Sequence, residues 1–229
     1  MKSLSEWSLQ FDILWNNIMS NKAPGLNVYE KSSFLTQAQL ALVKDVFTPK
    51  ANVLQEGIDD STRRQSDFKT LITNTAPQAA TPTNRFNTRT TTKYYTFPSD
   101  AFLVLDEEVM LNDRYMVVVP LSSEEYARLM KKPFKYPPKG QVWRLITDDK
   151  QIELIANFPQ SASLSYRMRY VKYPTPIILA DLPQGLTIEG VRLATECALP
   201  EHLADEIIQR AVLLAKLAWN DPVSVEQKN

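Results

Sequence analysis

The chain has 229 residues, of which 44% are hydrophobic and 23% are charged. A polypeptide of this size forms one large domain or two small ones, and it buries enough apolar surface to fold without disulfides or metal ions. The 26 basic and 26 acidic residues balance, which argues against a free-standing nucleic-acid-binding protein and leaves little charge repulsion to oppose self-association.

The cysteine content and the hydropathy pattern indicate the compartment. The single cysteine, Cys197, excludes an internal disulfide and favours a reducing environment. No long apolar core follows Lys2, as a signal peptide would require, and no stretch approaches the roughly 20 apolar residues of a membrane-spanning helix. We therefore expect a soluble protein that is made in the cytoplasm and has no membrane partner.

Two helices are predicted at the N-terminus. Ser3 with Glu6 and Asn27 with Glu30 have the spacing of helix-capping residues. Apolar residues follow each cap at helical spacing: Trp7, Phe11, Leu14, Trp15 and Ile18 in the first helix, and Phe34, Leu35, Ala38, Leu42 and Val46 in the second. The sequence therefore predicts a helical hairpin with an apolar face.

The next part of the chain is weakly patterned. A third helix is expected over residues 59–71. Residues 74–92 contain seven threonines and, apart from Phe86, almost no large apolar side chain. Such a segment cannot supply a core, and long segments without regular structure are usually functional or disordered. We interpret residues 74–92 as a loop or arm, with Arg85, Phe86 and Arg89 as candidate contacts to a neighbouring subunit.

The middle of the chain predicts strands. Short strands are expected at residues 94–97, 102–105 and 115–119, a hairpin at 142–147 and 151–156, and a strand at 163–173. In the last of these, Leu164 and the tyrosines and methionine that alternate after it form an apolar face, as in a half-buried antiparallel strand. Ser122 with Glu125 predicts a short capped helix.

The C-terminal part returns to helix. Residues 188–198 are expected to be extended, and Pro200 opens a helix whose apolar stripe includes Leu203, Ile207 and Ala211. The predicted fold class is α+β: a helical bundle, made of the N-terminal hairpin and the C-terminal helix, with an inserted antiparallel β-rich region. The expected divisions are 1–73 (helices), 74–92 (arm), 93–185 (β-rich insertion), 186–219 (C-terminal segment and helix) and 220–229 (flexible tail).

The residues predict no catalytic site, no metal site and no cofactor. His202 is the single histidine, and Cys197 is the single thiol that it could activate; the simpler interpretation is a capping or surface histidine beside a structural thiol. Zinc needs more ligands than these two residues. The pairs Glu107-Glu108 and Asp148-Asp149 are interpreted as turn or edge residues, because neighbours on a strand point to opposite faces.

A basic and aromatic loop is the main candidate for contact with a partner. It combines cations and rings that suit either a protein surface or a nucleic acid, and prolines that would stiffen it for docking. A solvated loop and a DNA contact remain open as alternatives. The candidate docking residues are Lys131, Lys132, Phe134, Lys135, Tyr136, Lys139 and Trp143.

Several segments resemble a known group of virion proteins. Residues 11–17, 23–27 and 30–39 resemble the N-terminus of structural proteins from crAss-like and related Bacteroides phages. Residues 166–179 are similar to a strand-plus-loop signature of the same proteins. Residues 197–203 and 205–212 resemble the closing helix of many phage head-to-tail adaptors. The arm and the basic loop are not part of this resemblance.

The resemblance implies a non-enzymatic ring subunit of the head-to-tail connector, or neck, which docks below the portal protein and beside neighbouring neck or tail proteins. Such rings commonly have twelve copies, and non-specific DNA passes through the lumen during genome ejection. The protein would then be assembled in the host cytoplasm and reside in the virion. The alternatives are another tail-tube or tail-completion protein, a hydrolase that uses Cys197 and His202, and a DNA-binding regulator.

Overall fold

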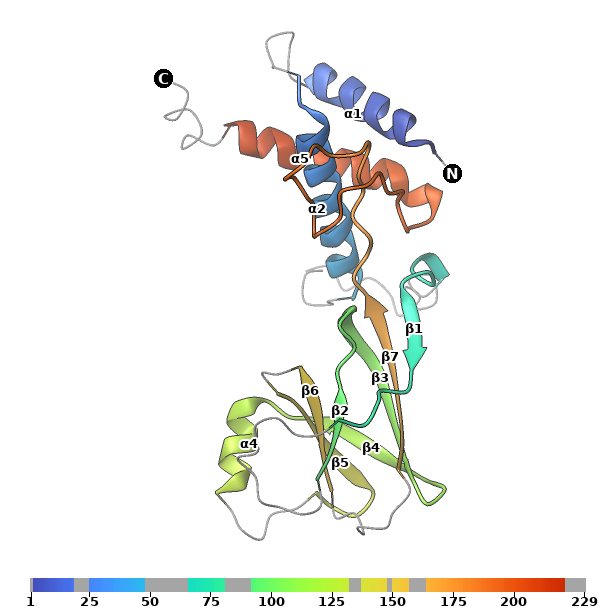
Figure 1. Ribbon diagram of the computed structural model, residues 1–229, viewed down its shortest axis with the longest axis vertical. Coiled ribbons are helices and arrows are strands. Elements are labelled where there is room, and N and C mark those ends of the chain that lie inside the picture. The colour runs from blue at the N-terminus through green and yellow to red at the C-terminus, as the bar shows by residue number, and fades with distance from the viewer. Residues whose placement is uncertain are drawn as a thin grey trace, which may run out of the picture. The chain divides into compact units, whose positions relative to one another are not determined.

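The chain folds into two compact units, each of which is described by itself (Figure 1). The helical unit combines Met1–Leu71 with Tyr173–Asn229, and the β unit comprises Ile72–Lys172. The β unit is thus an insertion in the sequence of the helical unit, and the predicted α+β class is confirmed. The computed structural model describes residues 2–18, 25–47, 66–80, 92–131, 137–147, 150–156 and 164–220.

Helix α5 (Ala204–Asn220) is the centre of the helical unit, because α1 (Leu4–Ile18) and α2 (Val28–Phe47) both pack on it. The predicted bundle of N-terminal helices and C-terminal helix is therefore confirmed. A 3-10 turn, η2 (Glu201–Leu203), precedes α5. The buried side chains of α1 and α5 lie on one face of each helix: Trp7, Phe11 and Trp15 on α1, and Ile207, Ile208, Ala211, Val212 and Ala215 on α5.

All three predicted capping boxes form. At the start of α1, the Glu6 backbone N–H donates to the Ser3 Oγ, and the Ser3 N–H donates to the Glu6 carboxylate at 2.7 Å. Asn27 and Glu30 make the same reciprocal pair before α2, and Ser122 with Glu125 begins α4 (Ser123–Met130). Each pair satisfies donors that the first turn of a helix leaves unbonded, so these helix starts follow from local sequence alone.

A buried polar row on α2 was not predicted. The Ser32 Oγ accepts a hydrogen bond from the Leu179 N–H, and the Thr36 Oγ1 accepts one from the Ile177 N–H, both at 3.1 Å. Gln39, one turn further along, is fully buried. These side chains hold the irregular segment that follows the β unit against α2, because backbone donors there would otherwise be buried without acceptors.

The β unit is built on a seven-stranded sheet with the order β1-β7-β3-β4-β5-β6-β2. All neighbouring pairs are antiparallel except β4 and β5, which are parallel and joined through α4. The strands are β1 (Ile72–Thr75), β2 (Thr92–Thr96), β3 (Ala101–Leu111), β4 (Arg114–Pro120), β5 (Gln141–Ile146), β6 (Gln151–Ile155) and β7 (Leu164–Lys172).

Residues 72–80 connect the two ends of this strand order. Residues 72–75 form β1, which pairs with β7. The same segment then reaches β2, where the Ala80 N–H donates to the Tyr94 carbonyl and the Thr96 N–H donates to the Gln78 carbonyl, both at 2.8 Å. One stretch of chain therefore covers the β7 edge and the β2 edge, which closes the curled sheet and protects edge groups that would otherwise be exposed.

The curled sheet encloses its own core. Side chains from β2, β3, β5, β6 and β7 form one buried cluster, in which the rings of Tyr95 and Tyr166 lie 5.1 Å apart. The predicted alternation of β7 is confirmed, since Tyr166, Met168 and Tyr170 are buried and the residues between them are exposed. Because the sheet is closed, strands near both ends of the strand order, β7 and β2, contribute side chains to this cluster.

Two local predictions were wrong. Strand β3 extends to Leu111 rather than ending near residue 105, so Glu107 and Glu108 lie inside a strand and not at a turn. Antiparallel pairing of β3 with β7 along this whole length outweighs the weak strand propensity of glutamate. Residues 188–198 were expected to be extended, but the chain turns at Glu189 and Gly190, where φ is positive, and Ile188 and Val191 form an isolated bridge across this turn.

Candidate assembly surfaces

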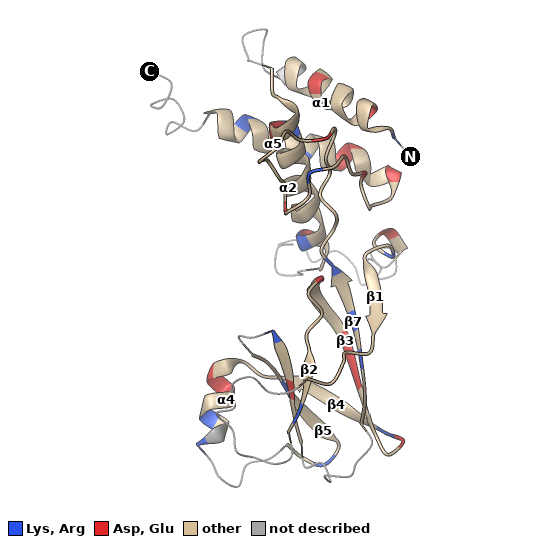
Figure 2. Cartoon of the chain, viewed as in Figure 1, with Lys and Arg blue, Asp and Glu red and all other residues tan. Residues whose placement is uncertain are grey.

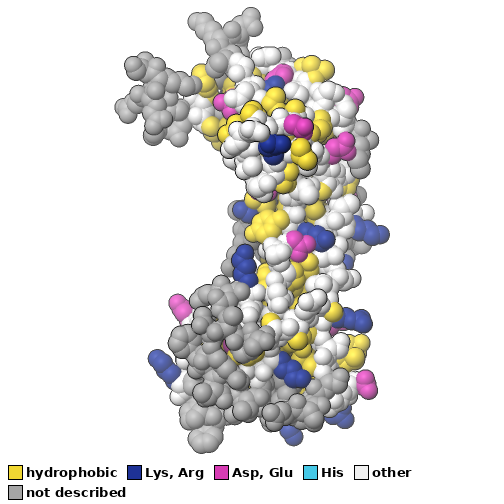
Figure 3. Space-filling view, viewed as in Figure 1, with side chains coloured by type: hydrophobic (Ala, Val, Ile, Leu, Met, Phe, Trp, Pro, Cys, Tyr) yellow, Lys and Arg dark blue, Asp and Glu magenta, His cyan; other side chains and the backbone are white. Residues whose placement is uncertain are grey.

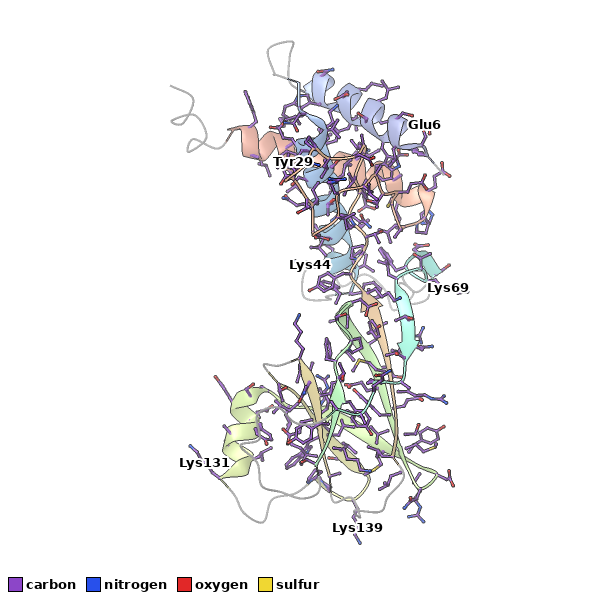
Figure 4. All side chains as sticks on the ribbon, in the orientation of Figure 1. Glu6, Tyr29, Lys44, Lys69, Lys131 and Lys139 are labelled. Carbon is purple, nitrogen blue, oxygen red and sulfur yellow. The ribbon has the colours of Figure 1, made fainter. Side chains whose placement is uncertain are left out.

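The structure describes three of the candidate docking residues, which lie in different environments. Lys131, at the end of α4, and Lys139, just before β5, are exposed, and Figure 4 shows both pointing away from the sheet. Trp143 is a core residue of β5 and is only 7% exposed. The other candidates, Lys132, Phe134, Lys135 and Tyr136, lie outside the described residues.

The arm is described only where it begins. Residues 78–80 lie along β2 through the hydrogen bonds given above. Residues 81–91, which include the candidate contacts Arg85, Phe86 and Arg89, lie outside the described residues. The structure therefore fixes the point at which the segment leaves the sheet, which is the edge of β2.

A buried ion pair joins β3 to β5. The Arg144 guanidinium lies 2.9 Å from the Glu107 carboxylate, and both side chains are almost fully buried. The Tyr166 hydroxyl of β7 donates to the same carboxylate. Burial, followed by the proximity of Glu107, raises the pKa of Tyr166 well above its usual range. The three side chains tie β3, β5 and β7 of the curled sheet together, which is a structural role.

A second buried carboxylate belongs to Glu153 on β6, which is 4% exposed. The hydroxyl groups of Tyr94 and Tyr126 donate to its Oε1 atom at 3.2 and 3.4 Å. These bonds link β6 to β2 and to α4, so the carboxylate fixes the position of the crossover helix. Neither Glu153 nor Glu107 lines the cavities found at Cys197, at Arg167 and at Tyr94.

Cys197 and His202 do not form the geometry of a nucleophile and its base. The Cys197 Sγ accepts a hydrogen bond from the Leu199 N–H at 3.4 Å, whereas the His202 Nε2 lies 3.3 Å from the Asp67 carboxylate. Burial raises the pKa of the Cys197 thiol, which disfavours the reactive thiolate. The pocket at Cys197 has a volume of about 20 Å³, enough for about one water molecule, and His202 does not line it.

Among the residues that the structure describes, no group of three or more His, Cys, Asp or Glu side chains is placed to hold a metal ion. None of the described helices is long and apolar enough to cross a membrane.

The outer face of β3 and β7 carries matched charges. Asp106 is opposite Arg169 and Glu108 is opposite Arg167 in the register of the two strands. Figure 2 shows the acidic residues of β3 beside the basic residues of β7. Opposite charges on directly paired strand positions stabilise the pairing. This face carries both acidic and basic side chains, so it is not a uniformly basic surface of the kind that binds DNA. Its residues line an open hollow of about 320 Å³.

Large apolar side chains remain exposed on two helices of the helical unit. On α1, Leu9 is 61% exposed and Ile13 is 50% exposed; on α5, Leu213 is 54% exposed and Leu217 is 68% exposed. Figure 3 shows hydrophobic side chains on the surface of this unit. The apolar stripes predicted from the sequence did not include these four residues. The i, i+4 spacing of these residues on the opposite face was the available signal.

The family is shown by comparison with known proteins. Residues 2–227 match the model of the crAss-like family described as "Phage tail ring protein 3/4". The chain is 44% identical to "Ring protein 4/5" of Bacteroides phage crAss001 over 225 residues, which cover 95% of this chain and 93% of that protein. It is 31% identical to "Ring protein 3" of the same phage over 218 residues, which cover 92% and 93%.

These matches confirm the resemblance seen in the sequence, and they agree with the absence of a Cys197–His202 pair in the described structure. A ring protein is homo-oligomeric, so this chain is one subunit of a larger assembly. Its exposed apolar side chains are therefore those of a single subunit taken by itself. The chain therefore belongs to the crAss-like phage tail ring protein 3/4 family, and it is a structural protein of the virion tail rather than an enzyme.

Proposed function

We propose that this chain forms a twelve-membered ring in the head-to-tail connector, below the portal, through which DNA passes during genome ejection. The observation that carries the proposal is the match to a tail ring family along residues 2–227, which leaves no room for a second, unrelated domain in the matched part. The ring itself follows from the family. The copy number, the position and the passage of DNA are the proposed refinements.

The charge balance supports a lumen that DNA can pass without being retained. The chain has zero net charge, and the described outer face of β3 and β7 alternates in sign. Tight DNA binding needs a basic surface that neutralises phosphates and releases counterions. A ring of such subunits gives the duplex few places to bind strongly, as genome ejection requires.

We assign contact with the portal or with neighbouring neck or tail proteins to the basic loop from Lys131 to Trp143. Of its described residues, Lys131 and Lys139 are exposed cations, while Trp143 anchors β5 in the core. A loop that begins at the end of a capped helix and ends in a core strand has fixed ends, which limits the conformational entropy lost on docking. The arm residues Arg85, Phe86 and Arg89 are proposed to contact an adjacent subunit.

Electron microscopy tests the copy number and the position. Rotational averaging of the purified ring is expected to give twelve-fold symmetry, and a gold-labelled tag on the chain is expected to mark the neck of the virion. A ring of another order contradicts the copy number alone. A label further down the tail places this protein in a tail-tube or tail-completion role and contradicts the connector position.

A charge-matched pair of variants tests the docking loop. Lys131→Ala with Lys139→Ala is expected to keep the ring but to weaken its co-assembly with a neighbouring tail protein or with the portal. Lys44→Ala with Lys69→Ala removes two exposed lysines from the helical unit, as Figure 4 shows, and is expected to leave co-assembly unchanged. If both variants weakened co-assembly equally, co-assembly would depend on the total charge of the protein and not on the loop.

A further inference from the structure

We infer that adjacent subunits of the ring join through α1 of one copy and α5 of the next. The inference rests on the proposed homo-oligomeric ring and specifies its interface. It starts from Leu9 and Ile13 on α1, called the α1 stripe, and from Leu213 and Leu217 on α5, called the α5 stripe. Each stripe is a pair of large apolar side chains spaced i, i+4 on one helix.

Both stripes lie on helix faces opposite the faces that pack within the described part of the helical unit. On α1, Leu9 is two residues from buried Trp7 and Phe11, which at 100° per residue places it on the opposite face. On α5, Leu213 is two residues from buried Ala211 and Ala215, with the same result. The buried faces hold the helical bundle together, so the outward stripes contribute nothing to its core and leave apolar surface in water.

Ring symmetry requires two different surfaces on each subunit. In a closed ring of more than two copies, every subunit meets its neighbours head to tail, so one patch contacts a different patch of the next copy. The helical unit has two separate apolar stripes, which is the minimum that such a ring needs. A single self-complementary patch would instead give a two-fold dimer.

The charges beside the two stripes are complementary. Helix α1 contains Glu6 and Asp12 and no basic residue. Residues 210–220 of α5, which carry its stripe, include Arg210 and Lys216 and no acidic residue. Figure 2 shows this contrast between acidic α1 and the C-terminal half of α5. Asp12 also bonds Lys31, and Arg210 also bonds Asp45 and Glu206, so these charges mainly select the partner and its register.

The test uses two full-length variants and their mixture. The α1 variant carries Leu9→Gln and Ile13→Gln, and the α5 variant carries Leu213→Gln and Leu217→Gln; glutamine preserves helix propensity and removes the apolar contact. Each variant is expected to lose the ring, with association weakened at least about a hundredfold, and to remain folded by circular dichroism. Native mass spectrometry measures the species present.

The mixture distinguishes this contact from any other. The α1 variant keeps an intact α5 stripe, and the α5 variant keeps an intact α1 stripe. Together they form one productive interface, so the expected species is a 1:1 dimer that cannot grow. Two variants that stay monomeric when mixed, or either variant forming a ring by itself, would overturn the inference.

A matched control removes exposed apolar side chains from the β unit. Tyr115 is 74% exposed and Val117 is 64% exposed on β4. Tyr115→Thr with Val117→Thr keeps strand propensity and is expected to leave the ring unchanged. Loss of the ring in this control would contradict an interface confined to the helices. Wild-type protein that remains monomeric would instead contradict the self-assembling ring, and the helix contact with it.

Discussion

The two units differ in how they are assembled from the chain and in how their buried polar groups are paired. The β unit comes from one continuous stretch, Ile72–Lys172, and residues 72–80 cover both edges of its strand order. Its buried charges, such as Glu107 and Arg144, are paired inside it. The helical unit is assembled from two distant segments and leaves leucine-sized side chains on the surfaces of α1 and α5.

The difference indicates a division of roles. A closed barrel with satisfied edges and a mixed-charge outer face is a self-contained body that resists unwanted strand pairing. A helical unit with unused apolar faces is suited to meet a second copy. The following predictions test whether the stability of the β unit depends on its buried polar pairs, and whether the helical unit depends less on such pairs.

The largest expected effect comes from breaking the buried pair in the β unit. Glu107→Ala leaves the Arg144 guanidinium buried without its carboxylate, and Tyr166 loses its acceptor. We expect the free energy of unfolding to fall by about 3–5 kcal/mol. Denaturant unfolding measures the loss, and hydrogen exchange should locate it in peptides from β3, β5 and β7.

The neighbouring residue provides the control. Glu108 has the same side chain one position along β3 but is exposed on the outer face. Glu108→Ala is expected to change the free energy of unfolding by less than about 0.5 kcal/mol. If the two variants were equally destabilised, the stability of the β unit would not depend on its buried pair.

Alkaline pH is expected to weaken the β unit next. Burial raises the pKa of Tyr166 beyond its usual range, and burial with the Asp100 hydrogen bond raises the pKa of Tyr170 to about 12. The unfolded chain ionises these phenols near pH 10, so their contribution to stability is complete below pH 10 and is lost as the pH rises toward 12. Unfolding measured across this range should show the decline.

A phenylalanine variant isolates the tyrosine contribution. Tyr166→Phe removes the group with the raised pKa, so stability should decline less steeply above pH 10, although it starts lower because Glu107 loses a donor. Tyr115→Phe changes an exposed tyrosine and should keep the wild-type slope. An unchanged slope in Tyr166→Phe would assign the alkaline loss to other groups.

A smaller gain is expected in the helical unit. Gln39 is fully buried on α2, and its Nε2 and Oε1 atoms have no hydrogen-bond partner in the described structure. Gln39→Leu removes two unsatisfied polar atoms at similar volume, which should raise the free energy of unfolding by about 1–2 kcal/mol. Gln37→Leu, exposed on the same helix, should have almost no effect. A destabilised Gln39→Leu would show that Gln39 has a polar partner in solution.

The smallest effect is expected at the surface of the same unit. Arg210 joins α5 to α2 through Asp45 and also pairs with Glu206 one turn away on α5. All three side chains are partly exposed, so Arg210→Ala should reduce stability by less than about 1 kcal/mol. The difference should shrink further in 1 M salt. A loss above about 2 kcal/mol would mean that this ion pair is a major element of the bundle.

The sequence predicted features that depend on near neighbours. The capping pairs Ser3–Glu6, Asn27–Glu30 and Ser122–Glu125 form as expected, because each involves residues three positions apart. The alternation along β7 was also predicted. The resemblance to phage connector proteins drew on short segments along the chain.

The candidate surfaces were less predictable. Trp143 was expected in a docking loop, but it is a buried residue of β5, and the sequence pattern of a basic and aromatic stretch does not distinguish these environments. The exposed pairs on α1 and α5 were missed because an apolar residue counts as core until packing shows which face is occupied. Burial is a property of the assembled helices and not of either helix alone.

Local chemistry in the sequence thus determined the helix starts, the main strands and the α+β class, and resemblance to known proteins indicated the family. Tertiary structure alone decided that residues 72–80 close the sheet, that Glu107 meets Arg144, and that Ser32 and Thr36 accept hydrogen bonds from residues more than 140 positions away. The physical reason is that hydrophobic periodicity reports on neighbours along the chain. Edge pairing, charge pairing and burial depend on which distant segments the fold brings together.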